Sequence, residues 1–511
     1  MSNVTSGSLA AGTFVGIRNE VINPTIAILE RKIVIVGVAD ATKLSGTLEV
    51  NTPRRVFSAG EVGAIAGQGT QIHRLAIAAY RGSNGIETWI IPQAEGGSDV
   101  VATGTITATA TSVKSGVLSL YVNGELFSIS IPTDSTATEV GDLIVAALAA
   151  DSDTPVTGAN VDGVVTVTAK SKGSWGNDIS LAVGLGGETA VTGLTLTIVD
   201  MASGSGIGDI TLALASMGSG DNSNENHFTA LIHGYGKDTT TLNAISEYVG
   251  EGNNATGCYD KINGRFFRSL IASVDNDLNS EITLASGRKN DRANGLVVAP
   301  NSPAHPSEIA AVTMGLMEAE NSQRAGGSYF NFIQPNVLLG ATRWSDDYNS
   351  RDIAVKNGVS PILAKSGASA LQNIVTFYRP DDVPVANNGY RSMRNISISQ
   401  NIVYAVRKYF EQENWQNITI VADVAKVTNP LARKRAKDVR AVKDAILYLA
   451  GEFVALGWIY SIDSVVEGLK ALDSVTVRAG GTGFDYVMKV IYSGEGGILN
   501  NDVIFDINFA G

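Results

Sequence analysis

Cysteine is almost absent from this sequence, because Cys258 is the one cysteine among 511 residues. A single thiol excludes an internal disulfide framework and a cysteine-rich metal site. It also fits a reducing compartment, since disulfide frameworks belong to oxidising ones. With 44% hydrophobic residues, the composition indicates a globular chain that is held together by its core.

Charge is also scarce. Charged residues make up 17% of the chain and leave a formal net charge of -12. A general nucleic-acid binder needs a clustered basic surface to neutralise phosphates, so the composition argues against one. No run approaches the ~18 apolar residues of a membrane-spanning helix, and the first residues lack the pattern of a signal peptide. We therefore expect neither membrane insertion nor a secretory leader.

The length allows about three or four domains. Residues 1–20 are small, polar and glycine-rich, which predicts an extended N-terminal arm. Alternating strand and helix patterns follow in residues 21–100, as in "KIVIVGVAD", "TQIHRLAIAAYRG" and "IETWIIP", and they return in residues 201–380. These two stretches predict one α/β middle domain that a different segment interrupts.

The interrupting segment, residues 101–200, has a different composition. It has no arginine, and three lysines against ten carboxylates leave a net charge of −7. In "GVLSLYVNGELFSISIP", Asn123 and Gly124 separate two alternating runs, which predicts a β-hairpin. We expect an inserted, β-rich outer module. The whole chain is thus predicted to be a multidomain α/β (α+β) protein with mixed-sheet core domains.

Residues 381–500 predict a C-terminal domain with two long helices. "NISISQNIVYAVRKYFEQEN" places Ile398, Ile402 and Tyr409 on one face, and "ARKRAKDVRAVKDAILYLAGEFVALGW" does the same with Ile446 and Phe453. "DSVTVRA" and "DYVMKVIY" then predict strands.

Residues 501–511 predict a C-terminal strand arm, "NDVIFDINFAG". Its apolar positions alternate with Asp506 and Asn508, the period of a half-buried strand. A strand at the end of a chain has backbone groups that an adjacent strand can pair with, and proteins usually protect such strand edges. We expect the arm to pair with another strand through Val503, Phe505, Ile507 and Phe509.

Signatures of enzyme chemistry are missing from the sequence. Gly236-Lys237 is followed by Asp238, so no phosphate-binding loop is predicted, and "VIVGVADATKLSG" lacks the glycine spacing of a dinucleotide site. His227 and His233 flank the predicted strand "HFTALIH". Two interpretations are open: a metal or acid–base site, or two partly buried or solvated histidines at the ends of the strand. Asp346-Asp347 and Asp381-Asp382 fit solvated turns better than an acid/base pair. We predict no catalytic, cofactor or metal site.

One basic cluster contrasts with the acidic chain. Between residues 431 and 448, six cations against two carboxylates give a net charge of +4 on one predicted helix. A solvated helix face, a docking surface for an acidic protein partner and, more weakly, a nucleic-acid site are the three interpretations. The candidate contact residues are Arg433, Lys434, Arg435, Lys437 and Arg440.

Three further stretches have a distinctive order: "GVVTVTAKSKGSWGNDISL" (163–181), "RDIAVKNGVSPIL" (351–363) leading into "IVTFYRPD", and "RSMRNISISQNIVYAVRKYFEQENWQN" (391–417). Together with the terminal strand, they resemble the tail sheath proteins of contractile-tailed phages, in particular the Mu-like branch. The similarity extends over most of the chain. Residues 1–20 and much of 186–225 match only loosely.

The resemblance implies a structural subunit rather than an enzyme. Such subunits stack as hexameric rings around an inner tail tube and contract to drive the tube through the target cell envelope. It implies that the C-terminal domain faces the tube, that inserted domains project outward and that both arms add strands to neighbouring subunits. The expected partners are the subunit itself, the tail tube protein, and the baseplate and tail terminator proteins. The expected location is the phage virion after assembly in the host cytoplasm.

Three alternatives remain at this point. The sheath of a phage-derived bacteriocin or of a contractile injection system has the same mechanics. A secreted α/β hydrolase with a β-rich binding insert would need a nucleophile or an acid/base set, which the sequence does not supply. A surface-layer protein would need a signal peptide.

Overall fold

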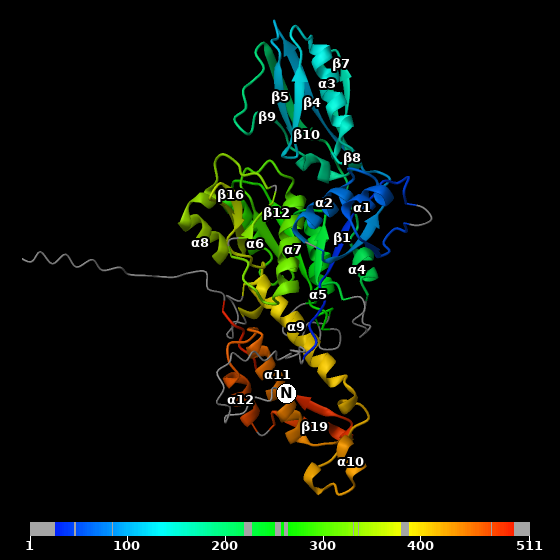
Figure 1. Cartoon of the computed structure of the whole chain (residues 1–511), viewed down its shortest axis with the longest axis vertical. Helices are drawn as coiled ribbons and strands as arrows, with labels where there is room; N and C mark the ends of the chain where they lie inside the picture. Colours follow the sequence, from blue (N-terminus) through cyan, green and yellow to red (C-terminus); the bar gives the residue numbers. More distant parts are fainter. Residues whose placement is uncertain are drawn as a thin grey trace, which may run out of the picture.

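The computed structural model describes residues 26–494 apart from 45–47, 84, 219–226, 251–256, 260–263, 331, 336, 380–387 and 472. Three parts follow one another along the long axis of the molecule (Figure 1). An inserted module lies at one end, a body built on one large sheet lies in the middle, and a C-terminal part lies at the other end. The predicted mixed α/β, multidomain fold is confirmed.

The body contains a nine-stranded sheet in the order β14-β16-β15-β13-β12-β11-β1-β3-β2. The six strands from β15 to β3 are parallel, and the strands at both edges are antiparallel. The strands are β1 (Lys32–Val38), β2 (Arg54–Val56), β3 (Glu87–Gln93), β11 (Ala230–His233), β12 (Arg268–Ser273), β13 (Asn294–Val298), β14 (Phe332–Ile333), β15 (Val359–Lys365) and β16 (Ala368–Leu371). Because helices cover both faces, the central strands read as continuous apolar runs such as "KIVIVGV" in β1.

Seven helices within the described residues belong to the body: α1 (Ala59–Ala66), α2 (Gln71–Ser83), α4 (Thr211–Ser216), α5 (Thr239–Val249), α6 (Leu278–Ser286), α7 (Pro306–Gln323) and α8 (Tyr348–Lys356). Helices α2 and α7 cross at a pair of glycines. A Cβ on Gly82 would lie 2.5 Å from the Val312 carbonyl oxygen, and one on Gly315 would lie 2.5 Å from that of Ala79. The two backbones therefore touch, which fixes the position of one helix against the other.

The inserted module has a core of its own. It is built from β4 (Val101–Ala110), β5 (Gly116–Val122), β6 (Glu125–Ile131), α3 (Ala137–Ala150), β7 (Val156–Val161), β8 (Val164–Lys172), β9 (Leu181–Val183) and β10 (Leu194–Ala202). The strands form a four-stranded sheet, β10-β4-β8-β7, and a three-stranded sheet, β6-β5-β9. The hairpin expected at Asn123-Gly124 is present, with positive φ angles of 54° and 74° at these residues.

The C-terminal part is mainly helical. It contains α9 (Met393–Phe410), β17 (Thr419–Ile420), α10 (Pro430–Arg435), β18 (Ala436–Lys437), α11 (Val439–Ala455), α12 (Asp463–Lys470), β19 (Val475–Val477) and β20 (Phe484–Tyr486). Helix α9 enters both neighbouring cores, because Met393 and Ile396 pack in the body and Ile398 and Ala405 pack in the C-terminal part. The strand expected over residues 485–492 is shorter than predicted, since β20 ends at Tyr486.

Candidate functional site

The residues expected to form the strand arm, Val503, Phe505, Ile507 and Phe509, lie outside the described residues, as does the N-terminal arm at residues 1–20. The described chain does contain the five basic residues and the surface that surrounds them. Both belong to the C-terminal part, at the end of the molecule opposite the inserted module (Figure 1).

The predicted single basic helix is two helices in the structure. Asp438 breaks it, because its carboxylate accepts hydrogen bonds from the backbone N–H of Ala441 at 2.8 Å and of Val424 at 3.2 Å, and so begins α11. The two residues before it form β18, which pairs in parallel with β17. Asn429 caps the short helix α10 by accepting from Leu431 and Ala432. Sequence periodicity misses this break because local capping overrides it.

The five basic residues therefore come from three elements. Arg433, Lys434 and Arg435 are exposed on α10, and Arg440 is exposed on α11. Lys437 lies in β18 with its ammonium 4.7 Å from the centre of the Trp415 ring. None of the five forms an ion pair within the part of the chain that the structure describes. We call these five cations the basic lobe.

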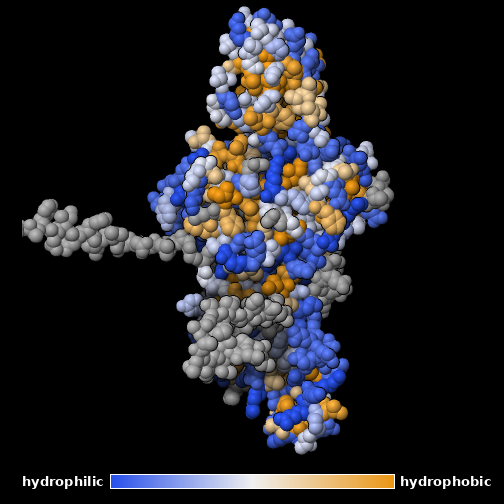
Figure 2. Space-filling view, viewed as in Figure 1, coloured by the Kyte–Doolittle hydropathy of each residue, from blue (hydrophilic) through white to orange (hydrophobic). Residues whose placement is uncertain are grey.

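An apolar side chain lies within the basic lobe. Leu431, on α10, is 77% exposed and lies close in sequence to the three cations of that helix. Figure 2 shows hydrophobic and hydrophilic side chains side by side at this end of the molecule.

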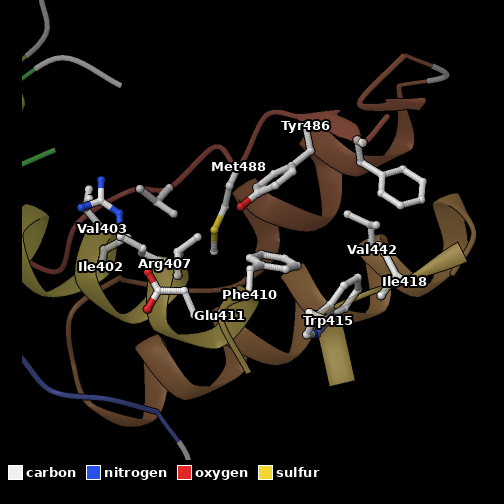
Figure 3. Close-up of a pocket in the computed structure, with 14 residues that line it drawn as sticks. Ile402, Val403, Arg407, Phe410, Glu411, Trp415, Ile418, Val442, Tyr486 and Met488 are labelled. Atoms are coloured by element: carbon white, nitrogen blue, oxygen red, sulfur yellow. The ribbon is translucent and has the colours of Figure 1, made fainter. Parts of the chain in front are cut away.

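A second surface of the C-terminal part is an apolar groove of about 620 Å³ (Figure 3). Helix α9 contributes Ile402, Val406 and Phe410 to one wall. The groove is further lined by Trp415 and Val442, and by the alternating residues Phe484, Tyr486, Met488 and Val490. The ring of Phe410 lies 4.8 Å from that of Trp415 and 5.6 Å from that of Tyr486, measured between ring centres.

The sequence predicted an apolar face on α9, and the structure leaves part of that face open as a groove. The period-2 alternation of residues 484–490 is the signal that could have located the other wall. Burial in this wall raises the pKa of Tyr486 to about 12. The Tyr486 side chain is therefore neutral at physiological pH.

The two histidines of the strand "HFTALIH" are both buried. Six residues of extended chain separate them by about 20 Å. Burial lowers the pKa of His227 and of His233 to about 4, so both are neutral. His227 Nε2 lies 2.7 Å from the Phe266 carbonyl oxygen. No cluster of three or more potential metal ligands occurs among the described residues.

The acidic pairs are structural where the structure describes them. Asp347 accepts from the backbone N–H of Ser350 at 2.8 Å and so caps α8, and Asp346 pairs with Arg343 at 2.8 Å. Asp381 and Asp382 lie outside the described residues. No helix in the described ranges is long and apolar enough to cross a membrane.

The sheet does contain the crevice at which α/β proteins often bind ligands. Strand β1 lies between β3 and β11, so the strand order reverses at the carboxyl end of β1. Gln71 fills this point by accepting from the backbone N–H of Val38 at 2.7 Å and donating to the Gly234 carbonyl at 2.9 Å. Residues 172–175 and 206–208, at the base of the inserted module, cover it and leave about 10 Å³. The crevice is therefore too small for a ligand.

Comparison with known proteins gives one curated relative and several solved structures. No protein-family model matches the chain. The Mu-like prophage FluMu tail sheath protein of Haemophilus influenzae is 24% identical over 388 residues, which cover 75% of each chain. The resemblance to Mu-like tail sheath proteins that the residues predict is thereby confirmed.

The solved structures are more distant. A sheath tail protein from Desulfitobacterium hafniense is 10% identical with a TM-score of 0.43, over 94% of this chain and 100% of that one. A sheath tail protein from Listeria innocua is 11% identical with a TM-score of 0.44, over 92% and 93%. The contracted sheath complex of an extracellular contractile injection system is 8% identical with a TM-score of 0.46, over 98% and 99%.

Proposed function

We propose that this chain, a relative of Mu-like tail sheath proteins, is the repeating subunit of a contractile tail sheath. The observation that carries the proposal is the 24% identity over 388 residues with such a protein. In this role, subunits stack as hexameric rings around an inner tail tube. They contract to drive the tube through the target cell envelope.

The proposed orientation places residues 381–500 against the tube and residues 101–200 outward, with the body formed by residues 21–100 and 201–380 between them. The positions of the C-terminal part and the inserted module at opposite ends of the long axis support it (Figure 1). The charges support it too. A net charge of −7 on the outer module would keep neighbouring tails apart, while the basic lobe would face an acidic tube surface.

We assign the contact with the tube to the basic lobe, with Leu431 as its apolar centre. Each exposed ion pair contributes at most about 1 kcal/mol, so the contact depends on repetition along the sheath. Replacing Arg433, Lys434 and Arg435 together by Glu should abolish co-assembly of the sheath with the tube at low salt. The matched control replaces Arg324, Lys356 and Lys470, three exposed cations outside the lobe, by Glu. Normal co-assembly of the lobe variant would overturn the assignment.

We assign the acceptor for a neighbour's C-terminal strand arm to the apolar groove. Within the described residues, β19 is the one strand paired with β20, so the other edge of β20 has no partner there. The groove wall uses every second residue, Phe484, Tyr486 and Met488, and the apolar side chains of the arm, Phe505, Ile507 and Phe509, have the same spacing. An added strand gains affinity from backbone hydrogen bonds and specificity from such alternating side chains.

Negative-stain microscopy of the purified protein tests the function directly. A sheath subunit should form hollow tubes or rings by itself, and a monodisperse monomer at high concentration would contradict the proposal. Deleting residues 500–511 should leave a folded protein that no longer polymerises. If the deletion variant formed unaltered tubes, the arm assignment would be wrong while the sheath function would stand.

The proposed partners are further copies of the chain, the tail tube protein, and the baseplate and tail terminator proteins. The proposed location is the phage tail, after assembly in the host cytoplasm. The role is structural rather than enzymatic and uses no cofactor, since the energy of contraction would be stored in the lattice at assembly. The filled crevice at β1 and the neutral, widely separated histidines support this.

A further inference from the structure

The base of the inserted module rests on the carboxyl edge of the body sheet, at the crevice beside β1. Its two connections to the body run side by side, because Val100 and Ser205 exchange backbone hydrogen bonds of 2.9 and 3.2 Å. A module attached by two adjacent strands could swing about them as on a hinge. The contacts at its base decide whether it does.

The central contact is a buried ionic cluster between the module and the body. The guanidinium of Arg74, in α2, is 1% exposed and binds both oxygens of Glu308, in α7, at 2.8 and 2.9 Å. It also donates to Glu125 of the module at 3.0 Å. Asn123 of the module donates to Glu308 at 2.7 Å, and Arg81 of α2 donates to Glu125 at 2.7 Å. We call these five residues the Arg74 joint.

The charges of the Arg74 joint depend on one another. Burial opposes the positive charge of Arg74, but Glu308 and Glu125 outweigh this and raise its pKa above the ordinary value. Burial alone would raise the pKa of Glu125, but the guanidinium groups of Arg74 and Arg81 outweigh burial and lower this pKa. Swinging the module away would leave Arg74 with one of its two carboxylates, Glu308, and would remove the Asn123 donor from Glu308.

A second contact lies beside the joint, at the start of α7. The Trp175 ring of the module lies 4.6 Å from the ring of His305, measured between ring centres, and its indole N–H donates to Ser307 at 3.0 Å. Ser180 of the module donates to the Pro303 carbonyl at 2.5 Å. The module is thus held at several points of α2 and α7, and the glycine crossing fixes these two helices to each other.

We propose that the carboxyl edge of the sheet is a socket that fixes the inserted module to the body through the Arg74 joint, so that module and body move as one rigid unit. In other α/β proteins this edge of the sheet binds small molecules, whereas here it binds the inserted module. The connections at residues 94–100 and 203–209 do not act as a hinge. In a polymer of this chain, any rotation of the body would be transmitted undiminished to the tip of the module.

Single-molecule energy transfer tests the rigidity of this mount. Ser130→Cys on the module and Asn349→Cys on the body provide exposed labelling sites, and the native Cys258 is buried. Doubly labelled chains are diluted into unlabelled protein, so that the state of assembly does not matter. The parent chain should give one narrow efficiency distribution, and Arg74→Ala should broaden or split it.

A matched control is Lys172→Ala, which removes a more exposed pair with Glu95 at the same junction and should leave the distribution narrow. If Arg74→Ala does not fold, Trp175→Phe, which loses the hydrogen bond to Ser307, replaces it and should broaden the distribution less. A folded Arg74→Ala variant as narrow as the parent would overturn the proposal. So would a parent distribution that is already broad.

Discussion

The body is joined to its two neighbours in different ways. The inserted module meets it through side chains that interlock across a boundary, at the Arg74 joint, and the module keeps a separate core. The C-terminal part shares an element with it, because Met393 and Ile396 of α9 belong to the body core and Ile398 and Ala405 of the same helix belong to the C-terminal core. Side-chain contacts between two separate cores can be removed and leave both parts folded. A helix that contributes to both cores cannot be removed without disrupting both of them.

Buried polar groups reinforce the shared helix. Gln400 of α9 donates to the carbonyl oxygens of Thr229 and Phe266 at 2.9 Å each and accepts from Arg31 at 2.5 Å. Arg31 lies 3.9 Å from Glu318, which also pairs with Arg268. This network joins the segment before β1, the body and α9 into one unit. The comparison teaches that the C-terminal junction is part of the fold and the module junction is an addition to it.

The largest expected effect comes from breaking the network at α9. Glu318→Ala leaves the buried guanidiniums of Arg268 and Arg31 without a carboxylate, and removing one partner of a buried pair costs about 3–5 kcal/mol. The free energy of unfolding from chemical denaturation measures this. Glu320→Ala, two residues away, removes a pair with the exposed Arg324 and should cost under about 1 kcal/mol. Equal losses in the two variants would show that the network does not stabilise the junction.

Acid should destabilise the body more than the module. His227 and His233, in the body, have pKa values of about 4 because they are buried, whereas the unfolded chain binds protons near pH 6.5. Stability therefore falls as the pH drops from 6.5 towards 4, by about 2 kcal/mol for each histidine at pH 5.

Residues 101–200 contain no histidine, so the module lacks this effect. Hydrogen exchange at pH 5 and pH 7, read from peptides of each region, should show protection lost in the body first. Earlier loss in the module would contradict the assignment of the acid effect to the two histidines.

The smallest effect is expected from removing the module. Val100 and Ser205 lie side by side, so a short Gly-Ser-Gly linker can replace residues 101–204. Because Arg74 keeps Glu308, the remaining chain should stay folded and lose under about 2 kcal/mol of unfolding free energy. Circular dichroism and denaturation measure this. A chain ending at residue 392 is the contrasting variant and should not fold, since it lacks Met393 and Ile396 of the body core. An unfolded module-deleted chain would refute the comparison.

Local patterns predicted much of the fold. The alternation around Asn123 and Gly124 predicted a hairpin because few residues tolerate the positive φ angles that its turn requires. The spacing of apolar residues in α9 and the unbroken apolar run of β1 predicted a helix and a buried strand. The predicted basic helix was wrong at Asp438, where a cap and a two-residue bridge to β17 divide it.

The surfaces were harder to predict. The five basic residues were identified from charge alone, but their division among α10, β18 and α11 was not. The sequence did not predict the apolar groove, because its two walls, α9 and residues 484–490, are far apart in the chain. In addition, a partly open apolar face has the same sequence pattern as a fully buried one.

The sequence by itself determined the elements, the acidic character of the inserted segment and the resemblance to tail sheath proteins, because these depend on neighbouring residues and on composition. The tertiary structure alone decided how the parts are joined. Arg74 reads in the sequence as one polar residue of an amphipathic helix, and its carboxylates lie 51 and 234 residues further along the chain. Burial among such distant partners makes it a joint, because a charge out of water needs its partner in place.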